Sequence, residues 1–286
     1  MDEKRLSLAL GGGAAKGLAH VGVLRGLEED GIEIEAIAGT SMGSIVGALF
    51  ARGMTAREME GFFSAVDWSR LGGIMVRSPG GAAFSDLLRE TIGETSIEEL
   101  DRPFAAVCCD LDSGEEVVLR AGDLAESVRA SSAIPGILSP VTVNDRILVD
   151  GAMVTPVPAA VAARLSDAPV VAVNVLRPPM PGRPATSMMG KFFEGSAPAH
   201  VLGRVDAMLK RHRVRLWHRK TDFPNRLEVM MRSFHIMQYN LSKLCGSDLH
   251  AVEPEVGEIG WFDFHRAREI MAEGYRAYRE SAQQGS

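Results

Sequence analysis

The sequence predicts an α/β fold in which a mostly parallel central sheet is covered by helices. In its first half, short apolar runs typical of strands alternate with longer runs whose apolar residues recur at helical spacing. The chain has 286 residues and 46% of them are hydrophobic, which is enough to bury a sizeable core. A disordered chain and a small disulfide scaffold are therefore excluded.

The individual elements are predicted from residue spacing and from the glycines that end them. A buried strand at residues 6–10 is followed by a glycine-rich loop and by a helix over residues 18–30, in which Leu18, Val21 and Leu24 recur at helical spacing until Gly31. The further predicted elements are strands at residues 32–38, 104–109, 115–120, 147–149 and 170–175, helices at residues 44–51, 55–66 and 261–279, and a glycine-rich loop at residues 70–83. The strands at 104–109 and 115–120 are expected to form a hairpin.

Four prolines at positions 178, 179, 181 and 184 interrupt this pattern. Beyond them the composition changes: half of the 14 methionines lie between Met180 and Met237, and residues 204–220 carry seven Lys or Arg against one acid. We therefore divide the chain into a catalytic domain at residues 5–180, a variable Met-rich and basic segment at residues 181–240, and a helical region at residues 241–286 that packs on the core.

Composition excludes several classes of protein. With 31 basic and 37 acidic residues the formal net charge is −6, so no general attraction to nucleic acid is expected. No apolar run approaches the roughly 18 residues of a membrane span, and Asp2 and Glu3 do not suit the start of a secretion signal. The three cysteines, Cys108 and Cys109 among them, suit neither a disulfide framework nor a zinc site, so we expect a reducing, cytoplasmic location.

A G-x-S-x-G pattern, Gly39-Thr40-Ser41-Met42-Gly43, lies between a predicted strand and a predicted helix. In that context the serine sits on a tight, strained turn, and the flanking glycines let both chain segments pass without a Cβ clash. The amides at the start of the helix favour developing negative charge. Ser41 is therefore a candidate nucleophile, and the alternative is that it only caps the helix.

The run Gly11-Gly12-Gly13-Ala14-Ala15-Lys16-Gly17 directly follows the first predicted strand. Glycines there allow close approach of a ligand and leave amides available to bind an anion. Lys16 precedes Gly17 and Leu18, which does not fit the G-K-[ST] of a P-loop, and the second strand lacks the final acid of a dinucleotide site. We expect these amides to face Ser41 and hold an oxyanion, and the alternative is a structural turn.

Asp150 ends an apolar strand and is followed by Gly151 and Ala152. We expect its carboxylate to reach the sheet edge where the two loops gather, and the alternative is a turn-forming Asp-Gly pair. None of the seven histidines is a strong candidate for the base of a serine triad: His20 lies one turn into the first helix, and the others fall in the less regular C-terminal third.

The run Asp110-Leu111-Asp112-Ser113-Gly114-Glu115 is similar to a calcium loop, but its glycine comes one position early and the bidentate Glu is absent. We expect a hairpin turn there and no metal site.

Three ordered motifs resemble those of the patatin-like phospholipases, in particular the bacterial and neuropathy-target-esterase-like branch. They are L-A-L-G-G-G-A-A-K-G-L-A-H-V-G-V-L at residues 8–24, G-T-S-M-G at residues 39–43 and D-G-A at residues 150–152, and A-I-P-G at residues 133–136 is also similar. The resemblance covers about residues 5–180.

This resemblance implies a three-layer α/β/α patatin-like fold and a Ser–Asp dyad that needs neither metal nor cofactor. Ser41 would be the nucleophile, and Asp150 the base that activates it and later the deacylating water. The amides of Gly12, Gly13 and Ala14 would supply the oxyanion hole. Because Ala14 stands where many members have glycine, Gly12 and Gly13 are expected to be the main donors.

The expected function is hydrolysis of carboxylic esters of lipids, as by a lysophospholipase or phospholipase. One alternative keeps the fold and passes the acyl group to an alcohol or thiol; such acyltransferases commonly rely on a His that this chain does not obviously supply. An alternative of another class is a nucleotide-binding module that uses the glycine loop.

The Met-rich segment suggests peripheral contact with a membrane surface. Met188, Met189, Phe192 and Phe193 precede six basic residues, Lys210, Arg211, Arg213, Arg215, Arg219 and Lys220, and such a combination suits acyl chains beside anionic head groups. The alternative is that the apolar residues belong to helices packed on the sheet and that the charges form a solvated face.

Overall fold

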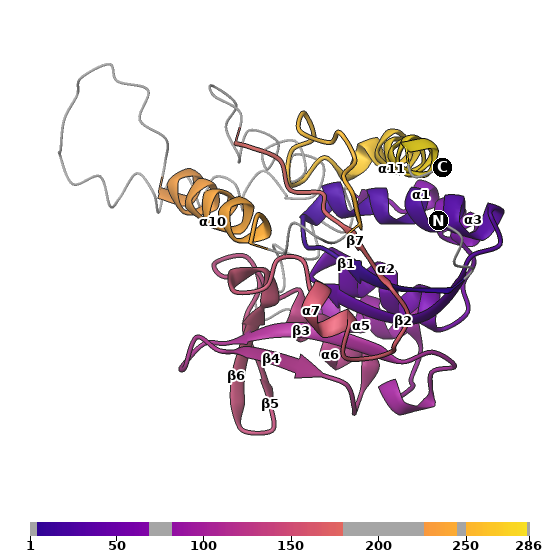
Figure 1. Ribbon diagram of the computed structural model, residues 1–286. Coiled ribbons are helices and arrows are strands. Elements are labelled where there is room, and N and C mark those ends of the chain that lie inside the picture. The colour runs from indigo at the N-terminus through magenta and orange to yellow at the C-terminus, as the bar shows by residue number, and fades with distance from the viewer. Residues whose placement is uncertain (1–4, 69–81, 180–225, 245–249, 285–286) are drawn as a thin grey trace, which may run out of the picture.

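A single mixed sheet organises the molecule. The computed structural model describes residues 5–68, 82–179, 226–244 and 250–284 (Figure 1). The sheet has eight strands in the order β5-β6-β3-β2-β1-β7-β8, with β4 also paired to β3. The strands are β1 (Arg5–Leu10), β2 (Glu33–Thr40), β3 (Phe104–Asp110), β4 (Glu116–Leu119), β5 (Val141–Val143), β6 (Arg146–Asp150), β7 (Val170–Val173) and β8 (His250–Val252).

The sheet is parallel from β3 through β2, β1 and β7 to β8. At its other side β4 and β6 both pair antiparallel with β3, and β5 pairs antiparallel with β6. The predicted parallel centre and the predicted hairpin of β3 and β4 are thus confirmed. The direction of β6 matters for the site, because Asp150 is its last residue.

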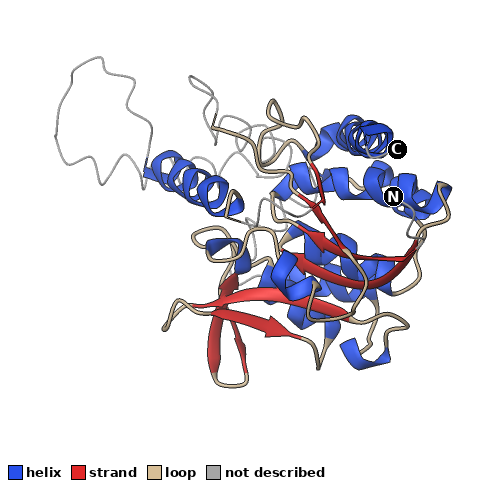
Figure 2. Ribbon diagram, in the orientation of Figure 1, coloured by secondary structure: helices blue, strands red, loops and turns tan. Residues whose placement is uncertain are grey.

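Helices cover both faces of the sheet and complete the predicted three-layer α/β/α arrangement (Figure 2). One face packs against α1, α2, α3, α5, α6 and α11, and the other is covered by α7. The helices are α1 (Ala19–Glu29), α2 (Met42–Ala51), α3 (Ala56–Ala65), α5 (Ala82–Ile92), α6 (Leu124–Ser131), α7 (Ala159–Ala162), α10 (Arg226–Ser242) and α11 (Ala267–Gln284). Among these helices, none is both long enough and apolar enough to cross a membrane.

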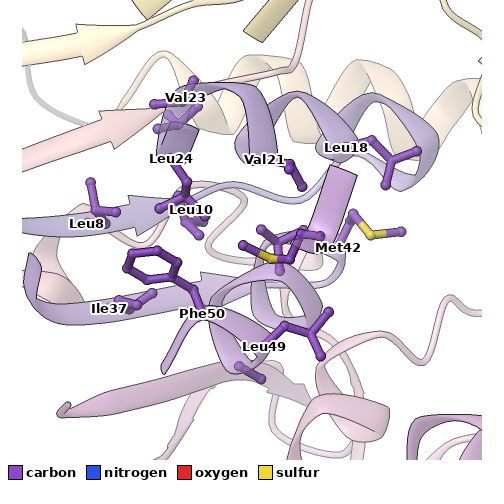
Figure 3. Packing of buried hydrophobic residues seen from close by; sticks show 14 of the residues in the cluster. Leu8, Leu10, Leu18, Val21, Val23, Leu24, Ile37, Met42, Leu49 and Phe50 are labelled. Carbon is purple, nitrogen blue, oxygen red and sulfur yellow. The ribbon is translucent and has the colours of Figure 1, made fainter. Parts of the chain in front are cut away.

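The alternation of β1 explains how the two faces differ. Leu8 and Leu10 enter the larger core, and Figure 3 shows them with Ile37 of β2 among side chains of α1 and α2. The residue between them, Ala9, belongs to the smaller cluster under α7. A strand that is apolar on both sides is typical of a parallel sheet buried between helices, and this burial fixes the register of β1.

Helix α11 packs on α1 with backbone touching backbone (Figure 1). A Cβ atom at Gly22 would lie 1.8 Å from the carbonyl oxygen of Met271, and one at Gly274 would lie 1.9 Å from that of Ala19. Side chains cannot be added at this crossing, so glycine on both helices sets their separation. The C-terminal residues thereby close the layer above the glycine-rich loop.

Several boundaries differ from those predicted. α2 begins at Met42, two residues earlier than predicted, because Ser41 alone connects it to β2. The last helix begins at Ala267 instead of residue 261, since Trp261 and Phe262 are buried in a cluster with Ala14 and belong to a turn region. α5, α6, α7, α10, β5 and β8 were not predicted. Most of the loop predicted at residues 70–83 lies outside the described residues.

The α1–α11 crossing gives a stability prediction. Gly22→Ala should lower the free energy of unfolding by more than about 3 kcal/mol, because the added methyl group meets backbone that cannot move aside. Gly61→Ala on α3 is the matched control: nothing lies within 4 Å of its Cβ position, so it should raise stability by up to about 1 kcal/mol. Denaturant unfolding measures both. Equal stability of the two variants would contradict the close crossing.

Candidate active site

Ser41 occupies a sharp turn between β2 and α2. Its φ of 53° and ψ of −122° lie where residues other than glycine are rarely found. Its backbone amide donates to Ser131 Oγ at 3.0 Å, and the Ser131 hydroxyl in turn donates to the Val107 carbonyl oxygen at 2.6 Å. Ser131 therefore ties the turn to β3 and helps to hold a backbone conformation that would otherwise relax.

The two glycines of the G-x-S-x-G pattern are required by close contacts. A Cβ atom at Gly43 would lie 2.0 Å from the Leu10 carbonyl oxygen. One at Gly39 would lie 2.5 Å from the carbonyl oxygen of Gly43. The start of α2 thus presses on the end of β1, as a nucleophile elbow requires.

Sheet register brings Asp150 to Ser41. Thr40 of β2 is paired with Val107 of β3, and the next residue of β3, Cys108, is paired with Asp150. Ser41 and Asp150 therefore follow one row across the sheet. The Ser41 hydroxyl donates a hydrogen bond to the Asp150 carboxylate. β6 runs antiparallel to β3, so the strand enters the sheet beyond the site and ends at it, with Asp150 as its last residue.

Asp150 is buried, with only 3% of its surface exposed. Its Oδ1 accepts from the Ala152 amide at 2.9 Å. A Cβ atom at Gly151 would lie 2.2 Å from the Val107 carbonyl oxygen, so the turn after the strand depends on glycine. Burial raises the pKa of Asp150 to about 6, although the hydrogen bonds from Ser41 and Ala152 oppose the shift.

The glycine loop lies beside Ser41. A Cβ atom at Gly12 would come within 3.4 Å of Ser41 Cβ. The Gly11 amide donates to the Val173 carbonyl oxygen at 3.1 Å, and the Gly12 amide donates to that of Pro156 at 2.8 Å. Both amides are thus used in holding the loop to its neighbours.

The amides of this loop differ in whether they are already hydrogen-bonded. The Gly12 amide, which the sequence favours as an oxyanion donor together with Gly13, donates to the Pro156 carbonyl oxygen. No described residue accepts a hydrogen bond from the amides of Gly13 and Ala14. Ala14, which has a φ of 48°, lines the same cavity as Ser41. The departure from glycine at Ala14 therefore does not remove its amide from the site.

The end of the glycine motif packs against the elbow and beneath α10. A Cβ atom at Gly17 would lie 2.6 Å from Met42 Cβ. The Lys16 side chain is buried, with 2% of its surface exposed. Burial lowers the pKa of His235 on α10 to about 4, and the positive charge of Lys16 adds to that shift. Lys16 thus connects the loop electrostatically to the helix above it.

Four described histidines can be placed relative to the pair. His20 bonds the Gly11 carbonyl oxygen, His235 bonds that of Arg177, and His250 bonds Ser281. None of these, nor His265, is hydrogen-bonded to Ser41 or Asp150. Within the described ranges, no three His, Cys, Asp or Glu residues are grouped so as to hold a metal ion.

An apolar cavity of about 120 Å³ adjoins Ser41. Its polar lining residues are Ser41, Thr91 and Ser132, and one wall is the face of α2 that carries Met42 and Ile45. Leu49 continues this face at helical spacing. The remaining lining residues are apolar and come from α3, α5 and the loops: Ala14, Phe62, Phe63, Val66, Trp68, Phe84, Leu87, Leu88, Ile92, Ile134, Leu138, Phe262 and Phe264.

The Met-rich segment is only partly described. Residues 188–220, which carry the predicted basic cluster, lie outside the described residues. In α10, Met231 is fully buried and packs with Ala14, Trp261 and Phe262, and Met230 lies at the edge of the same cluster. These two methionines therefore pack against other residues of this chain, and the choice between membrane contact and packing for the rest of the segment stays open.

Two features of the site were missed by sequence reasoning. Ser131 supports the elbow, and its signal was the run of small residues Ala130-Ser131-Ser132-Ala133 between two apolar stretches. Helix α5 forms a wall of the cavity, and its i, i+4 pair Leu88 and Ile92 was a helical signal. The hairpin expected at Asp110 is confirmed, with Asp110 Oδ1 accepting from the amides of Asp112 and Ser113.

Comparisons with known proteins agree on one family. A family model described as patatin-like phospholipase matches residues 8–163. An uncharacterized NTE family protein of Mycobacterium tuberculosis (strain ATCC 25618 / H37Rv) is 30% identical over 289 aligned residues, covering 98% of this chain and 47% of that protein. Patatin-like phospholipase domain-containing protein 6 of Mus musculus is 31% identical over 184 residues, covering 59% of this chain and 13% of that protein.

A solved structure supports the fold. VipD from Legionella pneumophila superposes with a TM-score of 0.50 at 13% sequence identity, covering 99% of this chain and 67% of that chain. A second uncharacterized NTE family protein of the same M. tuberculosis strain is 36% identical over 177 residues, covering 60% of this chain and 49% of that protein. The chain spans about half the length of the mycobacterial relatives it matches.

The burial of Asp150 gives a prediction for stability against pH. The folded pKa of about 6 exceeds the ordinary value of 3.8, so the folded state holds the proton more tightly and loses stability as the pH rises through 6. Asp150→Asn cannot ionise. It should therefore exceed the parent in free energy of unfolding at pH 8, by on the order of 2 to 3 kcal/mol.

The difference should vanish below the ordinary carboxyl pKa, where both proteins are uncharged at this position. Denaturant unfolding of both proteins at several pH values from 3.5 to 8 provides the measurement. An Asn variant that is less stable than the parent at every pH would mean that the hydrogen bonds from Ser41 and Ala152 stabilise the carboxylate by more than its burial destabilises it, contrary to the raised pKa.

Proposed function

Because this chain belongs to the patatin-like phospholipase family, we propose that it is a serine hydrolase that cleaves carboxylic esters of lipids. The observation that carries the proposal is Ser41 on its strained turn, with its hydroxyl on the Asp150 carboxylate and an apolar cavity beside it. A nucleophile, a base within hydrogen-bond reach and a place for an acyl chain are the parts such an enzyme requires.

In the proposed first step, Asp150 accepts the proton of Ser41 as Oγ attacks the ester carbonyl carbon. The carbonyl electrons move to its oxygen, and the amides of Gly13 and Ala14, which donate to no described residue, would donate to that oxyanion. The intermediate then collapses: the bond to the leaving alcohol breaks, and the alcohol takes the proton from Asp150. The acyl group is left on Ser41.

In the second step, water is deprotonated by Asp150 and attacks the acyl carbon. A second oxyanion forms in the same place and collapses to release the fatty acid, while the proton returns to Ser41 Oγ. A pKa of about 6 suits this exchange, since Asp150 is ionised at neutral pH and remains basic enough to accept a proton.

The lining of the cavity and its extent along α2 support a single acyl chain as the group bound. Met42, Ile45 and Leu49 follow one face of α2, and Leu49 lies eight residues from Ser41, which is about 12 Å along the helix axis. The almost apolar lining suits a hydrocarbon chain. We therefore propose lysophospholipids and other single-chain esters as the substrate class, drawn from a lipid surface that the protein contacts peripherally.

The proposed nucleophile is tested directly by substitution. Ser41→Ala should lower hydrolysis of a p-nitrophenyl ester by at least about 10⁴-fold and abolish labelling by an organophosphonate, while the fold survives. Asp150→Asn should lose activity to a comparable degree, because members of one catalytic unit do not contribute additively. Ser64→Ala, on α3 and away from the turn, is the matched control and should keep full activity and labelling. Labelling that persists in Ser41→Ala would place the nucleophile elsewhere.

The proposed acyl cavity is tested by filling it. Leu49→Trp should lower kcat/KM for dodecanoate and longer p-nitrophenyl esters by at least about tenfold, because the indole occupies the space of the distal chain. Acetate and butyrate esters should be hydrolysed at the parent rate. Val46→Leu is the matched control: it overpacks the buried face of the same helix without entering the cavity. If Leu49→Trp lowered kcat/KM equally for short and long esters, the cavity would not be the binding site of the acyl chain.

A further inference from the structure

His20 is fully buried and bonds the glycine loop. It is the second residue of α1, and its Nε2 lies 2.7 Å from the Gly11 carbonyl oxygen. Because a carbonyl oxygen accepts, Nε2 carries the proton and donates. Burial lowers the pKa of His20 to about 4, so the ring is neutral at neutral pH. His20 is hydrogen-bonded to neither Ser41 nor Asp150, so it takes no part in the proton transfers assigned to them.

The bonded carbonyl belongs to a peptide that is held at both ends. The Gly11 carbonyl and the Gly12 amide are parts of one planar unit. His20 donates to its oxygen, and its N–H donates to the Pro156 carbonyl oxygen at 2.8 Å. The rotation of this plane about the chain is therefore fixed by two opposed hydrogen bonds.

The elbow restricts the same carbonyl from another side. A Cβ atom at Gly43 would lie 2.7 Å from the Gly11 carbonyl oxygen, so the start of α2 packs directly against it. The preceding amide, that of Gly11, is fixed to β7 through the Val173 carbonyl oxygen. The amides of Gly13 and Ala14 come immediately after this clamped peptide, and their direction follows from its orientation.

The second ring nitrogen of His20 supports a role beyond packing. Nδ1 is buried and has no hydrogen-bond partner among the residues that the structure describes. An unpaired buried acceptor is destabilising, and an apolar side chain at this place would avoid it. The donor at Nε2 is therefore the feature of His20 that an apolar residue could not supply.

We propose that His20 is a positioning residue, whose hydrogen bond to the Gly11 carbonyl orients the Gly13 and Ala14 amides toward the oxyanion. The inference rests on the proposed function, because it assigns the geometry of that site. His20 acts through the loop and touches neither the substrate nor the reacting atoms.

The test compares His20→Leu, which removes the donor, with His20→Gln, whose side-chain amide can donate from about the same place. His20→Met is a second donor-free variant with a side chain that adapts to irregular space, for use if the Leu variant does not fold. Val23→Ala, at another buried position of α1, is the control for loss of packing alone.

We expect the donor-free variants to lower kcat by about 10- to 100-fold with little change in KM, because oriented amides act on charge that forms only in the transition state. The Ki of an alkyl trifluoromethyl ketone, which mimics that state, should rise by the factor by which kcat/KM falls. His20→Gln should recover most of the loss, and Val23→Ala should keep the parent kcat despite lower stability.

Amide resonances provide a readout that does not depend on turnover. The Gly13 and Ala14 amide signals should shift in the donor-free variants and return toward the parent positions in His20→Gln. Unchanged signals, or a Gln variant as impaired as the Leu variant, would overturn the positioning role. If the parent protein hydrolyses no ester, or Ser41→Ala keeps its activity, the proposed function fails instead, and the amide signals still decide whether His20 orients the loop.

Discussion

The close approach of the elbow to the end of β1 is the constraint on which the site depends. Gly43 packs against the Leu10 carbonyl oxygen so closely that a Cβ atom there would clash with it. This contact places Ser41 beside the glycine loop and obliges a residue with a side chain to adopt a φ of 53°. Such a conformation costs about 1 to 3 kcal/mol and persists only where the surroundings over-determine it. Ser131, which bridges the Ser41 amide and β3, is one of those surroundings.

Two buried titratable groups flank the elbow and respond to pH in opposite senses. Burial raises the pKa of Asp150 to about 6 and lowers that of His20 to about 4. The stability associated with Asp150 is lost as the pH rises through 6, whereas that associated with His20 is lost as the pH falls from about 6.5 toward 4. Around neutral pH, Asp150 is ionised and His20 is neutral. In these states Asp150 can accept a proton, and the neutral His20 ring can donate to Gly11 without adding a positive charge to the core.

Local sequence patterns predicted the parts of the fold that depend on neighbouring residues. β1, β2, α1 and the elbow follow from apolar spacing and from glycines within a few positions of one another. Asp150 was expected at the sheet edge where the two loops gather, and the structure places it there. The sequence did not indicate that β6 is antiparallel or how it is aligned with β3, because both follow from pairings distant in sequence. The Gly12 and Gly13 amides were favoured as donors because Ala14 stands where many family members have glycine. Nothing in the sequence indicates that Pro156, far along the chain, accepts from the Gly12 amide. His20 was considered a weak candidate for a catalytic base, and the sequence left its place in the core or at the surface open. The structure buries it, and its bond to Gly11 depends on how α1 folds back over the loop.

In the enzyme that we propose, helix α2 couples the nucleophilic serine to the recognition of the acyl chain. Its first turn carries the elbow, and its amides favour negative charge developing near Ser41. One face lines the cavity through Met42, Ile45 and Leu49, while Val46 lies in the core. Because one helix fixes both features, a shift of its axis would alter reactivity and chain binding together. α3 and α5 also line the cavity and carry no part of the elbow. Substitutions on those helices can therefore change the proposed acyl preference without disturbing the strained turn. Substitutions at the start of α2 would affect both the turn and the cavity.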